Sequence, residues 1–216
     1  MSPQHDFCYE VDGLHAERTD KMSALAGRRA SAREQLLEAA SKLFYSNGMT
    51  ATGIDAITGE AGVAKKSLYN NFASKHELML AYIVRRHDEW KRLYEARATA
   101  ANSSQDRVVA VFDAYIDHAE LADANGFRGC GLLNAAAELP VGSEGRSLVR
   151  QQKEEVEAIL TQHISDFTGD ARVGELAQHF SLLLEGGMER AGLEGNTAWL
   201  YRSRNIALSM LRALGD

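Results

Sequence analysis

The hydrophobic residues of this chain recur every three or four positions over most of its length, which is the spacing of one face of an α-helix. The first clear stripe runs through residues 32–47 and ends at Asn47-Gly48, a pair that commonly stops a helix. Proline, the strongest helix breaker, is absent between Pro3 and Pro140. The pattern predicts an all-α fold, with helices at 32–47, 53–60, 64–72, 74–97, 104–123, 127–139, 144–167, 171–191 and 196–214.

Small polar residues stand just before several of these helices. Their side chains can accept hydrogen bonds from backbone amides that have no partner within the first helical turn. The predicted N-caps are Thr52, Ser74, Ser143, Asp170 and Asn196.

The last two predicted helices carry an unusually wide apolar face. In residues 171–191 the stripe from Val173 to Ala191 steps by threes and fours almost without interruption. So wide a face is more than one helical bundle needs, which predicts a homodimer that forms through these two helices. A core formed wholly within one chain is the alternative.

Composition excludes several classes of protein. No apolar run approaches the roughly 18 residues that a membrane span requires, and the first 30 residues lack the apolar segment of a secretory signal. The two cysteines, Cys8 and Cys130, are too few and too far apart for a disulfide framework or a zinc module. We therefore expect a cytoplasmic protein that has no membrane contact and carries no metal or other cofactor.

Charge is distributed unevenly along the chain. Residues 28–97 carry twelve basic and eight acidic side chains, whereas residues 98–216 carry ten basic and seventeen acidic ones. A basic segment within a chain of net charge −6 indicates that one part meets a polyanion and the rest does not. Chance clustering on a solvated face is the alternative.

The stretch from Thr52 to Lys75 predicts two short helices joined by a turn at Gly62, where glycine adopts positive φ most easily. Apolar residues such as Ile57 and Leu68 can pack on the first helix and complete a three-helix core. The side chains then left facing outward from the second short helix suit phosphates and base edges, and so short a helix fits the major groove of DNA. These side chains are Lys65, Lys66, Ser67, Tyr69 and Asn70.

This stretch resembles the TetR family of transcriptional regulators, over residues 33–81. The family fold implies an N-terminal helix-turn-helix DNA-binding domain and a larger helical domain that binds a small molecule and dimerises through its last two helices. The resemblance rests on Phe44…Asn47-Gly48, Thr52…Ile57, Ala61-Gly62-Val63, Leu68-Tyr69…Phe72 and Ser74-Lys75.

The resemblance and the side-chain chemistry together suggest individual roles in DNA binding. The resemblance assigns Tyr69 to a phosphate contact, although a partly buried core position is the alternative. Lys75 and the Thr52 hydroxyl are expected near the DNA backbone, and Arg28 belongs to a basic arm that reaches a neighbouring groove. Base reading is expected of Lys65, Lys66 and Ser67. The complete predicted set is Arg28, Thr52, Lys65, Lys66, Ser67, Tyr69, Asn70 and Lys75.

Residues 127–139 resemble a helix that lies, in one branch of the family, between the ligand cavity and the DNA-binding domain. Cys130, Asn134 and Glu138 are four residues apart and are expected to share a face that lines this cavity. A packed cysteine and a solvated glutamate are the alternative, and core packing would also explain the other candidates. The predicted effector pocket comprises Trp90, Phe112, Tyr115, His118, Cys130, Asn134, Glu138, His163 and His179.

The sequence contains no GxSxG, HExxH or P-loop motif, so we expect no enzyme. The predicted function is sequence-specific regulation of transcription by a homodimeric repressor, which a small-molecule effector releases from a palindromic operator. The alternative is a related DNA-binding protein without such an effector, controlled by a protein partner or acting as an activator. The predicted domains are an N-terminal arm (1–27), a DNA-binding domain (28–75) and an effector-binding and dimerisation domain (98–216), with the helix 74–97 linking the last two.

Overall fold

The computed structural model describes residues 30–123, 126–169 and 171–214, and the regular secondary structure within these ranges is entirely α-helical. This confirms the predicted fold class. In the described ranges no helix is both long enough and apolar enough to cross a membrane. The helices are α2 (Ala32–Asn47), α3 (Ile54–Ala61), α4 (Lys65–Asn71), α5 (Lys75–Ala100), α6 (Ser104–Asp123), α7 (Gly131–Ala137), α8 (Glu144–Phe167), α9 (Val173–Glu194) and α10 (Ala198–Arg212).

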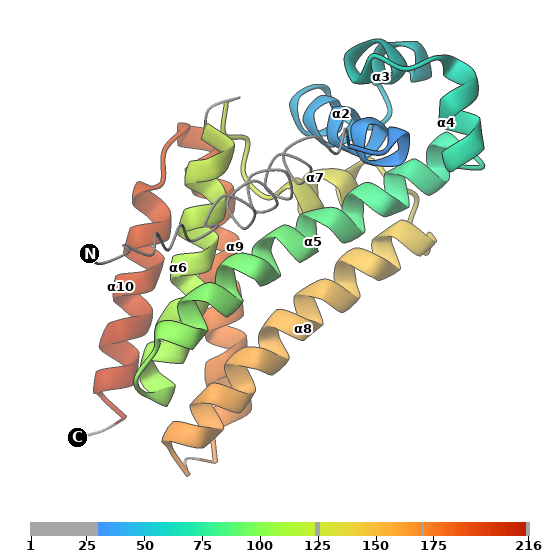
Figure 1. The fold of residues 1–216 in the computed structure, drawn as a ribbon. Coiled ribbons are helices and arrows are strands. Elements are labelled where there is room, and N and C mark those ends of the chain that lie inside the picture. The colour runs from blue at the N-terminus through green and yellow to red at the C-terminus, as the bar shows by residue number, and fades with distance from the viewer. Residues whose placement is uncertain (1–29, 124–125, 170, 215–216) are drawn as a thin grey trace, which may run out of the picture.

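The helices form a small N-terminal unit and a larger bundle. Figure 1 shows α2, α3 and α4 gathered at one end of the molecule, with α5 leading away from them into the bundle. Within the bundle α5 packs along α6, α8 along α9, and α9 along α10. The short helix α7 contacts α5 and α8 where the two units meet.

A compact apolar core holds α2, α3 and α4 together. Ala40 and Phe44 of α2, Ile57 of α3 and Leu68 of α4 are each at most 3% exposed. The turn between α3 and α4 has Gly62 in the left-handed region, with a φ of 66°, as predicted. This core confirms the predicted three-helix packing and determines which side of α4 faces outward.

Two of the predicted caps are confirmed by their hydrogen bonds. The Ser74 hydroxyl accepts from the backbone N–H of Glu77 at 3.1 Å, at the start of α5. The Ser143 hydroxyl accepts from the backbone N–H of Arg146 at 3.5 Å, at the start of α8.

Two other caps are predicted wrongly. Helix α9 begins after Arg172, so the predicted cap Asp170, which lies outside the described residues, stands too early in the chain. Helix α10 begins after Thr197 instead of Asn196. The Asn196 side chain nevertheless accepts a hydrogen bond from the backbone N–H of Ala198 at 3.1 Å, so it still satisfies an amide at that helix start.

The helix predicted at residues 127–139 is much shorter than expected, because α7 spans only Gly131–Ala137. The preceding residues are not helical, and Gly129 has a φ of 77°. At this point the chain passes so close to α9 that a Cβ on Gly192 would lie 2.4 Å from the Gly129 nitrogen. Packing of this loop against α9 therefore overrides the local helical pattern.

The wide apolar face of the last two helices is used mainly inside the chain. Phe180 and Leu184 of α9 and Leu200 of α10 are at most 1% exposed, and the Phe180 ring meets Phe112 of α6 edge-on at 6.0 Å. The intrachain core accounts for this stripe, so its width was the wrong reason to predict a dimer. The large apolar side chains that stay exposed on these helices are Leu182, Leu193, Tyr201 and Ile206.

Candidate nucleic-acid interface and effector cavity

The outward side of α4 is polar. Lys66, Tyr69 and Asn70 are exposed and Ser67 is half-buried, whereas Leu68 on the opposite side is fully buried. Tyr69 is 52% exposed, so the alternative of a core tyrosine is wrong. This face therefore presents an ammonium, a phenol and an amide, which can form hydrogen bonds with the phosphates and base edges of DNA.

Lys65 lies on the same helix but already has a partner. Its ammonium nitrogen is 2.8 Å from the Oδ1 of Asp55 on α3. The hydrogen bond to Asp55 raises the pKa of Lys65. A DNA phosphate or base would have to compete with this carboxylate, so Lys65 is less available than Lys66.

Lys75 stands at the first position of α5 and is tied to the loop that follows α2. Its ammonium donates to the backbone carbonyl of Thr50 at 3.2 Å. An ammonium group has three donors, so this bond leaves others for a phosphate. Its contact with DNA stays a prediction.

The prediction for the Thr52 hydroxyl is wrong. Thr52 is only 3% exposed, and its hydroxyl donates to the carbonyls of Gly48 at 2.6 Å and Leu43 at 3.2 Å. It neither caps α3, whose N-cap is Gly53, nor faces a phosphate. Arg28, the other predicted backbone contact, lies outside the described residues.

The loop before α7 is tied to the end of α2. The backbone N–H of Arg128 donates to the Tyr45 hydroxyl at 2.7 Å, and that hydroxyl donates to the Gly129 carbonyl at 3.1 Å. The Arg128 guanidinium donates in turn to the backbone carbonyls of Tyr45 at 2.9 Å and Ser46 at 2.5 Å. We call residues 127–138 the coupling segment, because they join the bundle to α2.

Glu138, at the other end of the coupling segment, binds the loop after α2 and does not line the cavity, so its predicted place in the effector pocket is wrong. Its carboxylate accepts from the backbone N–H groups of Met49 at 3.0 Å and Thr50 at 2.6 Å. Partial burial would raise the pKa of Glu138, but the hydrogen bonds from Thr50 and Met49 and the charge of Lys75 hold it below the usual value. Asn134 also turns away, and its amide donates to the Arg128 carbonyl at 3.0 Å.

A cavity of about 30 Å³ lies on the bundle side of the coupling segment. Four of the nine predicted pocket residues line it: Trp90 of α5, Tyr115 and His118 of α6, and Cys130. The other five do not. Besides Asn134 and Glu138, these are Phe112 in the apolar core, His163, whose Nε2 is 2.6 Å from the Tyr94 hydroxyl oxygen, and His179, exposed beside Glu175.

A buried lysine forms the charged side of this cavity, and sequence reasoning missed it. Lys153 of α8 lies 2.8 Å from the Oε1 of Glu185 on α9 and 3.4 Å from both the Tyr115 hydroxyl and the Cys130 sulfur. Burial alone would lower the pKa of Lys153, but Cys130, Tyr115 and Glu185 hold it well above the usual value. The neighbouring Gln152 could have indicated a polar site here, because it interrupts the apolar stripe of α8 at a core-facing position.

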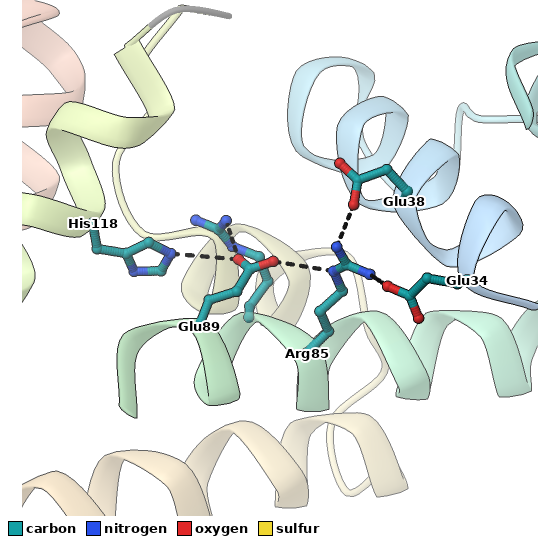
Figure 2. A network of polar contacts seen from close by, with 6 residues as sticks. Glu34, Glu38, Arg85, Glu89 and His118 are labelled. Carbon is teal, nitrogen blue, oxygen red and sulfur yellow. Dashed lines mark hydrogen bonds and ion pairs between the residues drawn. The ribbon is translucent and has the colours of Figure 1, made fainter. Parts of the chain in front are cut away.

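Sequence reasoning also missed a chain of ion pairs that links the cavity wall to α2 (Figure 2). Arg85 of α5 contacts Glu34 of α2 at 2.5 Å, Glu38 of α2, and Glu89 of its own helix at 3.1 Å. The second oxygen of Glu89 accepts from Arg86 at 2.8 Å and lies 3.7 Å from His118 Nε2.

The charges around Glu89 determine its ionisation. Burial would raise the pKa of Glu89, but His118, Arg86 and Arg85 lower it to about 2. Burial lowers the pKa of His118. Glu89 is therefore an anion at neutral pH, and it joins a residue of the cavity wall to the arginine that contacts α2.

Among the described residues, no three histidine, cysteine, aspartate or glutamate side chains are grouped to hold a metal ion. The arrangement instead combines an exposed polar helix, a small cavity, and two connections from the cavity wall to α2 and the loop after it, one through the coupling segment and one through Arg85.

Comparison with known proteins gives a family match for the N-terminal helices. The model of the bacterial regulatory proteins of the tetR family matches residues 36–82, which contain most of α2, all of α3 and α4, and the start of α5. Among curated relatives, the HTH-type transcriptional activator FasR of Mycolicibacterium smegmatis is 37% identical over 100 residues, covering 46% of this chain and 45% of that protein. The HTH-type transcriptional repressor KstR2 of Mycobacterium tuberculosis is 32% identical over 102 residues, covering 45% and 50%. The matched region thus spans about half the length of these relatives.

Solved structures extend the likeness to the whole fold. SCO4454, a TetR-family transcriptional regulator from Streptomyces coelicolor, superposes with a TM-score of 0.78 at 26% identity, covering 87% of this chain and 98% of that one. A TetR transcriptional regulator from Chloroflexus aurantiacus gives a TM-score of 0.74 at 21% identity over 84% and 94%, which supports the fold alone. The helix-turn-helix match, the curated relatives and the shared fold agree: residues 36–82 are a TetR-family helix-turn-helix region, and the described fold as a whole is that of TetR-family transcriptional regulators.

Proposed function

We propose that the chain is a homodimeric repressor that binds a palindromic operator through α4 and is released by a small molecule bound in the larger domain. The observation that carries this proposal is the polar outward face of α4, held on a rigid apolar core. In this proposal Lys66, Ser67, Tyr69 and Asn70 meet DNA directly, with Lys75 at the backbone. The proposed domains remain 28–75 for DNA binding and 98–216 for effector binding and dimerisation.

Dimerisation is proposed through the side of α9 and α10 that faces away from the chain's own core. Leu182 is 70% exposed and Ile206 is 49% exposed. Exposed apolar side chains on neighbouring helices favour an interface with a second copy. Two α4 helices related by a two-fold axis would then read half-sites about one helical turn of DNA apart.

The proposed mechanism couples the cavity to α2. A molecule that displaces the loop at Cys130 would pull on Arg128 and Glu138, which hold the end of α2 through Tyr45 and the amides of Met49 and Thr50. Moving α2 moves α4, because Leu68 is buried against the α2 core. Effector and DNA then weaken each other's binding, by an amount that in such systems is typically about 1–3 kcal/mol.

The first test is fluorescence anisotropy on DNA immediately upstream of the chain's own coding region, titrated against a scrambled duplex at about 150 mM salt. We expect a preference of at least several hundredfold for the upstream DNA. Equal and weak binding to both duplexes would call for selection of an operator from random sequences. Absence of binding even at low salt would refute a DNA-binding function.

Activation is a second candidate, because the relative FasR is named an activator whereas KstR2 is named a repressor. Activation and repression are both compatible with the same DNA-binding face. Transcription from the bound promoter, measured in vitro with and without the protein, separates them. A rise in transcript would replace the repressor proposal while leaving the DNA-binding face unchanged.

A further inference from the structure

Three buried polar atoms beside the cavity have no hydrogen-bond partner within the described part of the chain: Arg86 Nε, Trp90 Nε1 and Gln152 Oε1. Trp90 is 4% exposed and Gln152 is 8% exposed. Buried polar atoms in folded proteins are nearly always paired. Two N–H donors and a carbonyl acceptor around one small cavity therefore indicate a complementary group that both accepts and donates hydrogen bonds.

The charges near these atoms are already neutralised. Arg86 is paired with Glu89, and Lys153 with Glu185, each at 2.8 Å. An added anion would compete with Glu89 for Arg86 and with Glu185 for Lys153, and would leave one buried negative charge in excess. An added cation would meet Arg86 and Lys153. Since an unpaired buried charge is costly, the group that fits is uncharged.

A groove adjoins the cavity on the side of the DNA-binding unit. It has a volume of about 380 Å³ and is lined by α2, α5 and α6, including Tyr45, Leu93 and Leu121. Arg86 and His118 line both the groove and the cavity, so they form the partition between them. The cavity has room for only a few atoms, whereas the groove is of the size that holds a small organic ligand.

We propose that the effector is an uncharged molecule whose hydrogen-bonding head group enters the cavity between Arg86 and His118 and whose body lies in the groove between α2, α5 and α6. This inference rests on the proposed function, because it names the chemical class of the effector and its position. It places the body of the ligand directly against α2.

The position of the partition gives the ligand a direct effect on the DNA-binding unit. A ligand whose head group passes between Arg86 and His118 separates these two residues from Glu89, which Figure 2 shows between His118 and Arg85. Arg85 is the residue that contacts Glu34 and Glu38 of α2. Binding therefore disturbs the ion pairs that hold α2 against α5.

Three probes of nearly identical shape test the charge of the head group: benzamide, benzoate and benzamidinium. The chain has two tryptophans, Trp90 and Trp199, so a ¹⁵N-labelled sample gives two indole N–H signals, which the Trp90→Phe variant assigns. Trp199 lies on α10 beneath the guanidinium groups of Arg190 and Arg202 and serves as an internal control. Benzamide should shift the Trp90 signal in a saturable way and leave the Trp199 signal in place.

The charged probes should bind roughly tenfold or more weakly than benzamide. Equal or tighter binding of benzoate or benzamidinium would overturn the uncharged head group. No shift of the Trp90 signal with any probe, or a shift of the Trp199 signal alone, would overturn the site itself. The Trp90→Phe variant should also lose most of the rise in melting temperature that benzamide causes.

A second pair of variants tests the groove. Leu121→Trp places a new indole at the groove, and Val141→Trp places one on the loop after α7; the two native side chains are 68% and 90% exposed. Benzamide should shift the added indole signal of the Leu121→Trp variant and leave the added signal of the Val141→Trp variant unchanged. The opposite result would place the ligand body outside the groove. Operator binding measured without any probe tests the proposed function separately, so a protein that binds DNA but not benzamide refutes only this inference.

Discussion

At the scale of single residues, the polar side chains of α4 are not equally available to DNA. Lys65 is held by Asp55 at 2.8 Å, whereas the Tyr69 ring is 52% exposed. A phenol on a short, rigidly packed helix can donate to a phosphate with little loss of side-chain entropy, because its ring has only two rotatable bonds. Tyr69 is therefore the residue on which the DNA-binding proposal depends most directly.

Tyr69→Phe removes only the hydroxyl and should weaken binding to every DNA sequence by a similar factor, about threefold to tenfold, which is the usual contribution of one hydrogen bond. Anisotropy titrations on the operator and on single-base variants measure this. Tyr201→Phe is a matched control, because Tyr201 is 46% exposed on α10. A change in preference among the variants, with no uniform loss, would make Tyr69 a base-reading residue instead.

Glu89→Gln should destabilise the fold near neutral pH more than in acid. Burial would raise the pKa of Glu89, yet His118, Arg86 and Arg85 lower it to about 2. A carboxylate whose pKa is lowered by folding stabilises the folded state at pH values above its ordinary pKa. This stabilisation is lost as the pH falls toward the lowered pKa. Urea unfolding at about pH 7 and about pH 3.5 should show a penalty of roughly 1–3 kcal/mol that shrinks in acid. A penalty that does not depend on pH would mean that Glu89 acts through packing and not through charge.

At the scale of elements, the sequence predicts the helices well wherever local signals and packing agree. The predicted range 32–47 is that of α2, and Ser74 and Ser143 cap α5 and α8 as expected. The coupling segment was misjudged because its conformation depends on a distant contact, the close approach of Gly129 to Gly192. For the same reason Glu138 binds the amides of Thr50 and Met49 in the loop after α2, 88 and 89 positions away, which no spacing along the chain reveals.

The coupling segment should protect the end of α2 from local opening. Glu138→Gln replaces one acceptor oxygen with an N–H₂ group that faces an amide donor, so the amides of Met49 and Thr50 lose part of their hydrogen bonding. Hydrogen exchange at these amides should accelerate about tenfold, while exchange in α9 stays unchanged. Glu154→Gln is the control, since Glu154 is exposed on α8 and 3.6 Å from Arg150. Unchanged exchange at Met49 and Thr50 would show that Glu138 does not hold the end of α2.

At the scale of the whole molecule, α4 and α10 lie on opposite sides of the molecule, and α9 packs beside α10 (Figure 1). One α4 reads only a few base pairs, so specific binding at physiological salt needs two copies held at a fixed separation. The exposed side chains of α9 and α10 are the surface that can provide this. The proposed effector cavity lies between these two sides, beside Cys130 and the loop that packs against α9, so a ligand there would be positioned to affect the relative placement of two DNA-binding units.

Leu182→Glu should convert the proposed dimer to a monomer without unfolding the chain, because Leu182 is 70% exposed and contributes little to the chain's own core. A buried charge without a partner is costly at an interface, so sedimentation should show a monomer at concentrations where the parent chain is dimeric. Affinity for the full palindrome should fall by about a hundredfold or more, toward that for a single half-site, since the second contact is no longer linked to the first. Val141→Glu, at a position 90% exposed on a loop away from α9 and α10, should change neither property. A Leu182→Glu protein that stays dimeric and keeps its affinity would place the dimer interface on another face of the molecule.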